Sequence, residues 1–307
     1  MSNQKVLDPI IDAVILALSN GAAPWAKPWA AYDGGSSLPY NVVSRKAYRG
    51  LNVLILGMTP YTDPRWGTFA QWQTKGGTVR KGQKCTYVTF WKFLEVEKRG
   101  AAGNILPGQS DTIPIVKTYS IFNAEQIEGI APLAPPADFD PAAAIIAADA
   151  EGERIASEYL TRENIPLSHV GGGAWYMPSG DRVNVPPIGS FIGTSEYYST
   201  LFHECVHSTG HESRLKRPGV GDKSGFGSDK YAAEELVAEM GASILLATAG
   251  LAQPAVTDNS IAYLANWAEK IRADRGILLK AASASSKAVD LILNVKHGAA
   301  ADADATE

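Results

Sequence analysis

This sequence of 307 residues contains little cysteine and little histidine. Its two cysteines, Cys85 and Cys205, lie far apart and form no metal-binding spacing. No run of about 18 apolar residues occurs, so we expect no transmembrane helix. Asp8 and Asp12 interrupt the apolar stretch near the N-terminus, and no basic segment or cleavage pattern surrounds it, which argues against a signal peptide. We therefore expect a cytoplasmic protein with no structural disulfide and no membrane partner.

The composition is that of a globular protein, and its charge is unevenly distributed. Hydrophobic residues make up 45% and charged residues 20% of the chain. Residues 1–130 carry 14 Lys and Arg against 9 Asp and Glu, a net of +5, whereas residues 131–307 carry 14 against 23, a net of −9. Such a division indicates that the first part meets a polyanion, and ordinary variation between domains is the alternative.

The length accommodates two domains, and a segment rich in proline and alanine indicates where they meet. Residues 129–144 show no hydrophobic periodicity. We predict a first domain at 1–130, a linker at 131–145 and a second domain at 146–297. The small, acidic residues of 298–307 predict a disordered tail.

The first domain combines helical and strand patterns. Apolar spacing predicts a helix over 5–19, and glycines end two further predicted helices over 45–57 and 67–77. Residues 84–98 alternate and are rich in strand-forming types, so they predict a strand. Residues 114–123 predict its partner, with a hairpin or loop tip at 106–110. The fold class is therefore α+β.

The second domain is predicted to be mainly helical. A helix should begin at Pro141 and run to about Thr161. Two short strand-like runs within 173–187 flank a Ser-Gly-Asp turn and predict a hairpin. Thr194 or Ser195 is expected to cap a helix that ends at Gly210. Further helices are predicted over 231–250, 258–272 and 276–295.

The segment LFHECVHSTGH, residues 201–211, contains the pattern His-Glu-x-x-His, formed by His203, Glu204 and His207. Residues four apart on a helix share one face, so both imidazoles can point at one metal ion. Glu204 lies beside them and can act as a general base toward a water molecule, as peptide hydrolysis requires. The alternative is a pair of partly exposed helix histidines that bind no ion.

A catalytic zinc ion needs a third protein ligand. His211 follows Gly210, as the metzincin pattern begins to require, but the third histidine of that pattern falls at Ser213. The departure weakens the resemblance to metzincins, and His211 stays an open alternative.

Glu235 and Glu239 lie four apart in the next predicted helix, among apolar residues that make isolated carboxylates costly. This arrangement resembles the gluzincins, in which a glutamate of a later helix completes the site. The resemblance implies Glu235 as the ligand and Glu239 as an outer carboxylate that orients a histidine. The reverse assignment and a role for Glu234 stay open.

Zn²⁺ is the expected cofactor for two histidines and one glutamate, with Mn²⁺ or another divalent ion as the alternative. Tyr231 and His211 are alternative donors to an oxyanion. The glycine-rich segment 217–230 separates the two ligand helices and is either a lid or a loose connection.

Five of the seven tryptophans fall within residues 1–130, and cations lie between them. Aromatic faces that stack on bases, together with a basic groove, hold single-stranded nucleic acid. For Trp66, Phe69 and Trp72, three residues apart, we favour a role in the core. We assign DNA contacts to the cations and neighbouring rings of three stretches: Lys27, Trp29, Arg45, Lys46, Tyr48, Arg49, Arg80, Lys81 and Lys84.

The stretches PWAKPW, PYNVVSRKAYRGLNVLIL, WGTFAQWQTKGGTVRKGQK and VTFWK resemble the N-terminal domain of plasmid ArdC-type antirestriction proteins and of related conjugative TraC primases. LFHECVHSTGH and YAAEELVAEMGA resemble the zincin-like metallopeptidase domain that follows it in ArdC. The resemblance implies a protein that binds single-stranded DNA and shields incoming plasmid DNA from restriction during conjugation. Duplex DNA and a protein substrate stay open as further partners.

Two other functions remain compatible with the sequence. The chain could coat single strands without enzymatic activity, with a structural or inactive metal site. It could instead be a toxin-like protease with incidental basic patches, which would not bind single strands at about 0.15 M salt.

Overall fold

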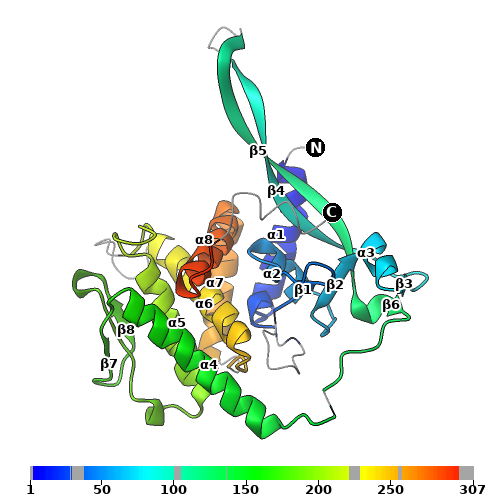
Figure 1. The fold of residues 1–307 in the computed structure, drawn as a ribbon. Helices are drawn as coiled ribbons and strands as arrows, with labels where there is room; N and C mark the ends of the chain where they lie inside the picture. The colour runs from blue at the N-terminus through cyan, green and yellow to red at the C-terminus, as the bar shows by residue number, and fades with distance from the viewer. Residues whose placement is uncertain are drawn as a thin grey trace.

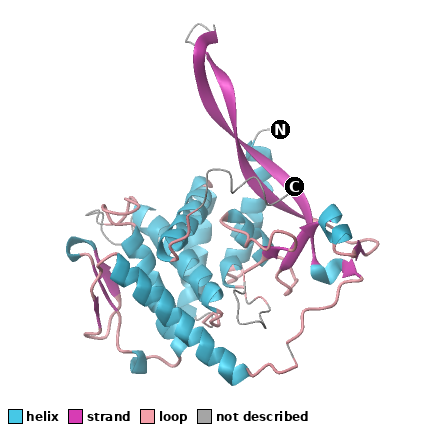
Figure 2. Ribbon diagram, viewed as in Figure 1, coloured by secondary structure: helices cyan, strands magenta, loops and turns pink. Residues whose placement is uncertain are grey.

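The computed structural model describes residues 3–27, 29, 38–99, 105–135, 137–220, 229–254 and 258–296. Figures 1 and 2 show a mixed region of short helices and strands beside a group of long helices. The elements of the first region are α1 (Asn3–Ser19), the 3-10 helix η1 (Pro24–Ala26), β1 (Tyr40–Asn41), α2 (Leu51–Gly57), β2 (Arg65–Thr68), α3 (Phe69–Thr74), β3 (Thr78–Val79), β4 (Thr86–Arg99), β5 (Ile105–Asn123), the 3-10 helix η2 (Ala124–Gln126) and β6 (Ile127–Glu128).

The main sheet of this region has the order β1-β2-β5-β4, with β1 and β2 parallel and the other pairs antiparallel. Strands β4 and β5 pair as a long two-stranded arm, residues 86–99 and 105–123, whose far end extends beyond the body (Figure 1). The predicted strands at 84–98 and 114–123 are confirmed. The predicted tip at 106–110 is wrong, because these residues lie within β5, where Ser110 pairs with Glu97. Strand β5 continues through Pro107 and Gly108 to Ile105, which pairs with Arg99, and the register shifts between Glu97 and Arg99 at this point.

The helix predicted over 45–57 forms only from Leu51 onward. Arg45 and Gly50 both have positive φ, of 60° and 56°, which a right-handed helix excludes. Residues before Gly50 instead form a turn in which Tyr40 pairs with Ala47. The shorter helix α3 is confirmed, and Thr68 begins it with a capping box to Gln71.

The second region contains five helices among the described residues and a small sheet. Its elements are α4 (Pro141–Arg162), β7 (Leu167–Ser168), β8 (Trp175–Met177), the 3-10 helix η3 (Pro178–Gly180), β9 (Arg182–Asn184), the 3-10 helix η4 (Ile188–Ser190), α5 (Thr194–Thr209), α6 (Asp229–Ala249), α7 (Asp258–Ala273) and α8 (Gly276–Ile292). The five helices and the β8–β9 hairpin confirm the predictions. The predicted cap of α5 is wrong, because Gly193 precedes the helix and no side chain caps it.

The largest hydrophobic core joins the two regions. Leu7, Ile11 and Val14 of α1 lie in one buried cluster with residues of α4 to α8, and α1 packs against α7. Trp25 of η1 enters the same cluster and contacts the ring of Trp267. The N-terminal helix therefore helps to hold the helices that carry the histidine motif.

Polar contacts reinforce this junction. Arg49 forms an ion pair with Asp290 of α8, and the backbone N–H of Gly50 donates to Oγ of Ser286 at 3.0 Å. Among the described residues, no helix is long and apolar enough to cross a membrane.

Candidate metal centre and basic surface

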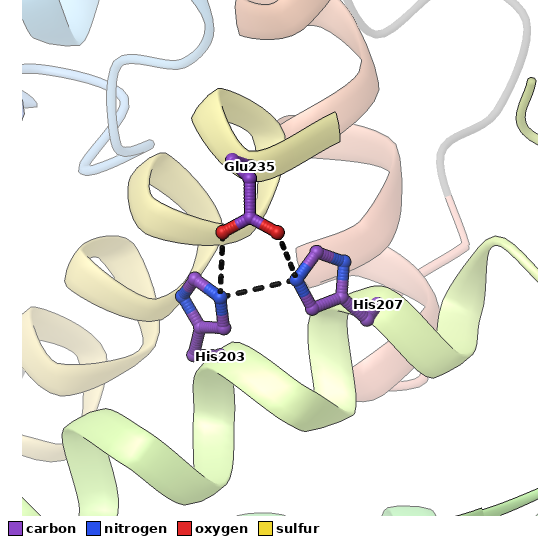
Figure 3. A group of neighbouring side chains, drawn as sticks. All are labelled: His203, His207 and Glu235. Carbon is purple, nitrogen blue, oxygen red and sulfur yellow. Dashed lines mark hydrogen bonds and ion pairs between the residues drawn. The ribbon is translucent and has the colours of Figure 1, made fainter. Parts of the chain in front are cut away.

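Helices α5 and α6 position the residues of the histidine motif. One side of α5 is buried and carries Leu201, Phe202 and Val206. His203 and His207 lie on a face of the helix that is turned toward α6 (Figure 3). A Cβ at Gly241 of α6 would lie only 2.7 Å from Cγ2 of Val206. Glycine at this position therefore lets the two helices approach closely beside the histidines.

His203, His207 and Glu235 converge on one point (Figure 3). The two Nε2 atoms are 3.1 Å apart. Oε2 of Glu235 lies 3.5 Å from Nε2 of His203, and Oε1 lies 3.5 Å from Nε2 of His207. Within the described part of the chain, this is the one cluster of His, Cys, Asp and Glu whose ligand atoms gather closely enough to hold an ion.

These separations fit a metal ion. Bonds of about 2.0–2.2 Å in tetrahedral geometry place neighbouring ligand atoms about 3.3–3.6 Å apart. The observed values of 3.1 and 3.5 Å are close to that range. Two imidazoles and one carboxylate are also a donor set that divalent transition-metal ions accept.

Glu204 lies beside the histidines and is buried, with 8% of its surface exposed. Burial raises the pKa of its carboxyl group, against the opposing influence of His203 and His207 and of a hydrogen bond to the backbone of Tyr176. A raised pKa makes Glu204 a better proton acceptor than an exposed carboxylate, as a general base requires.

Two outer carboxylates contact the far nitrogens of the histidine rings. Oε1 of Glu234 lies 3.2 Å from Nδ1 of His207, and Oε1 of Glu239 lies 3.8 Å from Nδ1 of His203. Arg217 holds Glu234 in place, with Nη2 at 2.6 Å from Oε1 and Nε at 2.9 Å from Oε2. The sequence indicated an orienting role for Glu239, but it held no signal that Arg217 would fix Glu234 behind His207.

The carboxylates favour positive charge at this point. Burial lowers the pKa of His207, but hydrogen bonds to Glu234 and Glu235 outweigh it, so the pKa is raised overall. Burial likewise raises the pKa of Glu235, but hydrogen bonds to His203 and His207 reverse the effect and lower it overall. A cation between the imidazoles would meet the same favourable field.

His211 lies outside this cluster. Its Nδ1 is 2.8 Å from Oγ of Ser213 and 4.0 Å from Oδ2 of Asp181. The tight turn after Gly210 directs it toward the β8–β9 hairpin, so the structure does not bring it to the ligands. Most of the glycine-rich segment 217–230, and the side chain of Tyr231, lie outside the described residues.

The residues assigned to DNA contacts fall into two groups. Trp29 and Tyr48 are buried in a second core cluster with Trp66, and Arg49 is used in the ion pair with Asp290. Lys27 lies 4.8 Å from the ring centre of Trp29 and donates to the carbonyl oxygen of Thr59. The structure therefore gives these residues internal contacts.

The other five assigned residues are exposed on the surface of the first region: Arg45, Lys46, Arg80, Lys81 and Lys84. Arg45 stacks on the ring of Tyr40 at 4.3 Å, and Arg80 donates to the carbonyl oxygen of Glu125 at 2.7 Å. As expected, Trp66 and Trp72 belong to the core, but Phe69 is exposed.

Exposed rings also occur on the β4–β5 arm, although none of the DNA contacts assigned from the sequence lies there. Tyr87 and Trp91 of β4 are both exposed. Phe90 and Tyr119, whose rings meet edge-to-face at 5.4 Å, are half-buried, and Lys117 of β5 pairs with Phe90. The alternation of rings and cations along paired strands was the available signal.

Comparison with known proteins matches each region separately. A family model described as a zincin-like metallopeptidase matches residues 154–284. A second, described as the N-terminal domain of anti-restriction factor ArdC, matches residues 4–122. These matches confirm the expected two-domain α+β organisation.

Solved structures and curated relatives cover nearly the whole chain. The metal-free crystal structure of antirestriction protein ArdC from the R388 plasmid matches with a TM-score of 0.68 and 31% identity over 93% of this chain and 96% of that one. Its Mn(II)-bound structure matches with a TM-score of 0.68 and 30% identity over 96% and 98%. An uncharacterised protein of Sinorhizobium fredii, y4eC, is 31% identical over 98% of this chain and 94% of its own length.

A DNA primase TraC of Escherichia coli is 32% identical over 93% of this chain, which spans only 27% of the primase. Two consecutive family models, and a solved structure matched along almost all of both chains, agree on the same relationship. The chain belongs to the ArdC family of antirestriction proteins, with an ArdC-type N-terminal domain followed by a zincin-like metallopeptidase domain.

Proposed function

We propose that this protein binds single-stranded DNA, protects incoming plasmid DNA from restriction during conjugation, and carries a divalent-metal site of peptidase type. The observation that carries the proposal is the convergence of His203, His207 and Glu235 beside the buried Glu204. The ArdC family relationship supports the antirestriction role.

His203, His207 and Glu235 would hold the ion. Zn²⁺ is the expected ion for this donor set, and Mn²⁺ is the alternative, since the related R388 protein has a Mn(II)-bound structure. When bound, such an ion would activate water and polarise a carbonyl group.

The chain's own residues would supply positioning and proton transfer. Glu204 would accept a proton from the attacking water on its carboxylate and return it to the leaving amine. Glu234, 3.2 Å from Nδ1 of His207, would fix the tautomer of that ring so that its Nε2 is available as a ligand, and the charge of Glu239, 3.8 Å from Nδ1 of His203, would favour a proton on that nitrogen.

The first region would hold DNA through exposed cations and rings. Arg45, Lys46, Lys81 and Lys84 are exposed to solvent and could meet phosphates. The exposed rings of the β4–β5 arm could stack on bases, which every base permits, so the binding would be sequence-tolerant. The net charge of +5 over residues 1–130 supports this assignment.

The substitution Glu204→Gln tests the catalytic part, because it keeps the shape of the side chain and removes the base. We expect it to abolish protection of conjugating plasmid DNA in a restricting recipient, while metal content and single-strand binding are kept. Glu212→Gln, at an exposed position in the turn after α5, is the matched control. Full protection by Glu204→Gln would instead support a non-enzymatic protein that coats single strands.

A gel-shift assay at about 0.15 M salt tests the DNA part, because weak charge contacts fade at that concentration. A retained shift with single-stranded DNA is expected. No shift at this salt concentration would instead favour a protease whose basic patches do not bind DNA.

A further inference from the structure

A cavity lies next to the metal centre, at the junction of the two domains. Its volume is about 230 Å³, and it opens between η1, α5, α6 and α7. Aromatic and small residues form most of its wall: Ala23, Trp25, Ala26, Ser199, Glu239, Ala242, Ser243, Gln253, Pro254, Tyr263, Leu264 and Trp267. Among these described lining residues, Glu239 is the one that carries a charge.

Three aromatic rings line one side of the cavity. The rings of Trp25 and Trp267 meet with their centres 6.1 Å apart, and those of Tyr263 and Trp267 with their centres 6.2 Å apart. Trp25 and Trp267 are fixed in the core, whereas Tyr263 is 59% exposed. The cavity therefore has a rigid aromatic wall and an accessible ring at its rim.

The polar side chains of Ser243 and Gln253 in the cavity wall bind to each other and to the backbone. Oγ of Ser243 lies 2.9 Å from the carbonyl oxygen of Trp25 and 2.8 Å from Oε1 of Gln253. Nε2 of Gln253 donates to the carbonyl oxygen of Ser243 at 2.9 Å. The carboxylate of Glu239, by contrast, is half exposed, with 49% of the side chain accessible. It therefore supplies the charge that an occupant of the cavity would meet.

Aromatic faces and a carboxylate together favour a cation. A guanidinium or ammonium group is attracted to the faces of tryptophan and tyrosine, and its aliphatic stem packs against apolar walls. No Lys or Arg stands among the described lining residues to neutralise Glu239. The net charge of −9 over residues 131–307 reinforces the attraction of a basic segment.

The cavity is also connected to the metal ligands. Oε1 of Glu239 lies 3.8 Å from Nδ1 of His203, and Ser199 precedes His203 by one turn of α5. A side chain seated in the cavity would therefore place its backbone near the proposed reacting centre.

We propose that this cavity is a subsite for a lysine or arginine side chain of a peptide. The assignment rests on the proposed peptidase-type site, since it takes the occupant to be part of a polypeptide that reaches His203. It narrows the protein substrate to one that presents a basic residue beside the bond that is attacked.

The test measures binding, so it does not depend on cleavage. Full-length protein carrying Glu204→Gln and loaded with Zn²⁺ is titrated in a calorimeter with acetylated, amidated alanine pentapeptides. Their central residue is arginine, lysine, citrulline or norleucine. We expect the arginine and lysine peptides to bind about tenfold more tightly than the neutral citrulline and norleucine peptides.

Two variants locate this preference. Tyr263→Ala removes the exposed ring. It should weaken the binding of the arginine peptide several-fold, with little effect on the binding of the norleucine peptide. Glu269→Gln, which removes a charge from an exposed position of the same helix outside the cavity, is the control and should change neither. Ser199→Leu, which fills the cavity from α5, should weaken the binding of both basic peptides. A thermal melt establishes that each variant folds.

Equal binding of the arginine and citrulline peptides, preference for norleucine, no effect of Tyr263→Ala, or no binding of the basic peptides would each overturn the assignment. If the Glu204→Gln protein prefers basic peptides but the unsubstituted, Zn²⁺-loaded protein cleaves none of them, the subsite stays in place and the catalytic part of the proposed function is removed. Cleavage without preference for basic residues would do the reverse.

Discussion

The two domains differ in how well the sequence indicated which of their side chains form a candidate site. In the zincin-like domain, His203 and His207 stand on one face of α5, as the spacing indicated, and Glu235 of α6 lies against them. In the N-terminal domain, most of the tryptophans that suggested a binding surface are in the core, including Trp29 and Trp66. A spacing rule therefore identified two side chains of a candidate metal site, whereas composition alone did not separate surface tryptophans from core tryptophans.

The difference has a physical cause. A metal ion needs ligand atoms within a few ångströms of one another, and a helix delivers that geometry from residues four apart. A tryptophan gains free energy both by stacking on a base and by burial in a core. Neighbouring cations such as Lys27 do not distinguish the two, because Lys27 also reaches the backbone of Thr59 inside the domain.

The contrast between buried and exposed rings has the largest expected effect. Trp66 is fully buried, so Trp66→Ala should lower the free energy of unfolding by about 3–5 kcal/mol. Trp91 is 42% exposed on β4, so Trp91→Ala should cost about 1 kcal/mol or less and weaken single-strand binding instead. Urea denaturation measures the free energy of unfolding of each variant, and a titration with single-stranded DNA measures its DNA affinity. A small loss of stability in Trp66→Ala would contradict the assignment of these rings to the core.

Removing one histidine tests whether the ligands act together. His203→Ala should lower divalent-metal affinity by more than about a hundredfold, which exceeds the effect expected for an outer partner. Metal content after dialysis, together with calorimetric titration, measures the loss. His211→Ala is the control, because His211 contacts Ser213 and Asp181 outside the ligand cluster. Equal losses for the two variants would contradict the assigned ligand set.

The outer carboxylates should have an intermediate effect. Glu234→Gln removes the acceptor at Nδ1 of His207 and should lower metal affinity about 10- to 100-fold. It also leaves the buried Arg217 without its carboxylate, so thermal stability should fall. Glu239→Gln should have a smaller effect on metal affinity, since Glu239 is half exposed and 3.8 Å from its histidine. The reverse order of the two effects would show that the ring of His203 is the more strongly held.

The basic surface should give the smallest effect per residue. The double substitution of Lys81 and Lys84 by alanine should weaken single-strand binding several-fold. It should also reduce the salt dependence of log K by about 0.7 for each phosphate that the protein no longer neutralises. The same double substitution at Lys280 and Lys287, two exposed lysines of α8, is the matched control. An unchanged salt slope for the first pair would place the DNA on another face, such as the β4–β5 arm.

Much of the secondary structure was predictable because it depends on local spacing. Apolar periodicity located α1, Pro141 marked the start of α4, and strand-forming residues located β4. The errors arose where a neighbour changed the outcome. Pro107 and Gly108 signalled a turn, but β5 extends through them to Ile105, with a shift of register opposite Glu97 and Arg99 of β4. The helix before Gly50 did not form, because Arg45 and Gly50 take positive φ angles in the turn that pairs Tyr40 with Ala47.

The sequence by itself determined the pair of imidazoles and the base between them, because a helix fixes residues one turn apart. Tertiary structure alone decided that Glu235 faces the pair, that Arg217 fixes Glu234 behind it, and that Trp25 lines a cavity beside Glu239. These contacts join residues distant in the chain. The distances between them depend on how closely the helices pack. The lack of a side chain at Gly241 allows α5 and α6 to approach closely, and no local sequence pattern predicts that distance.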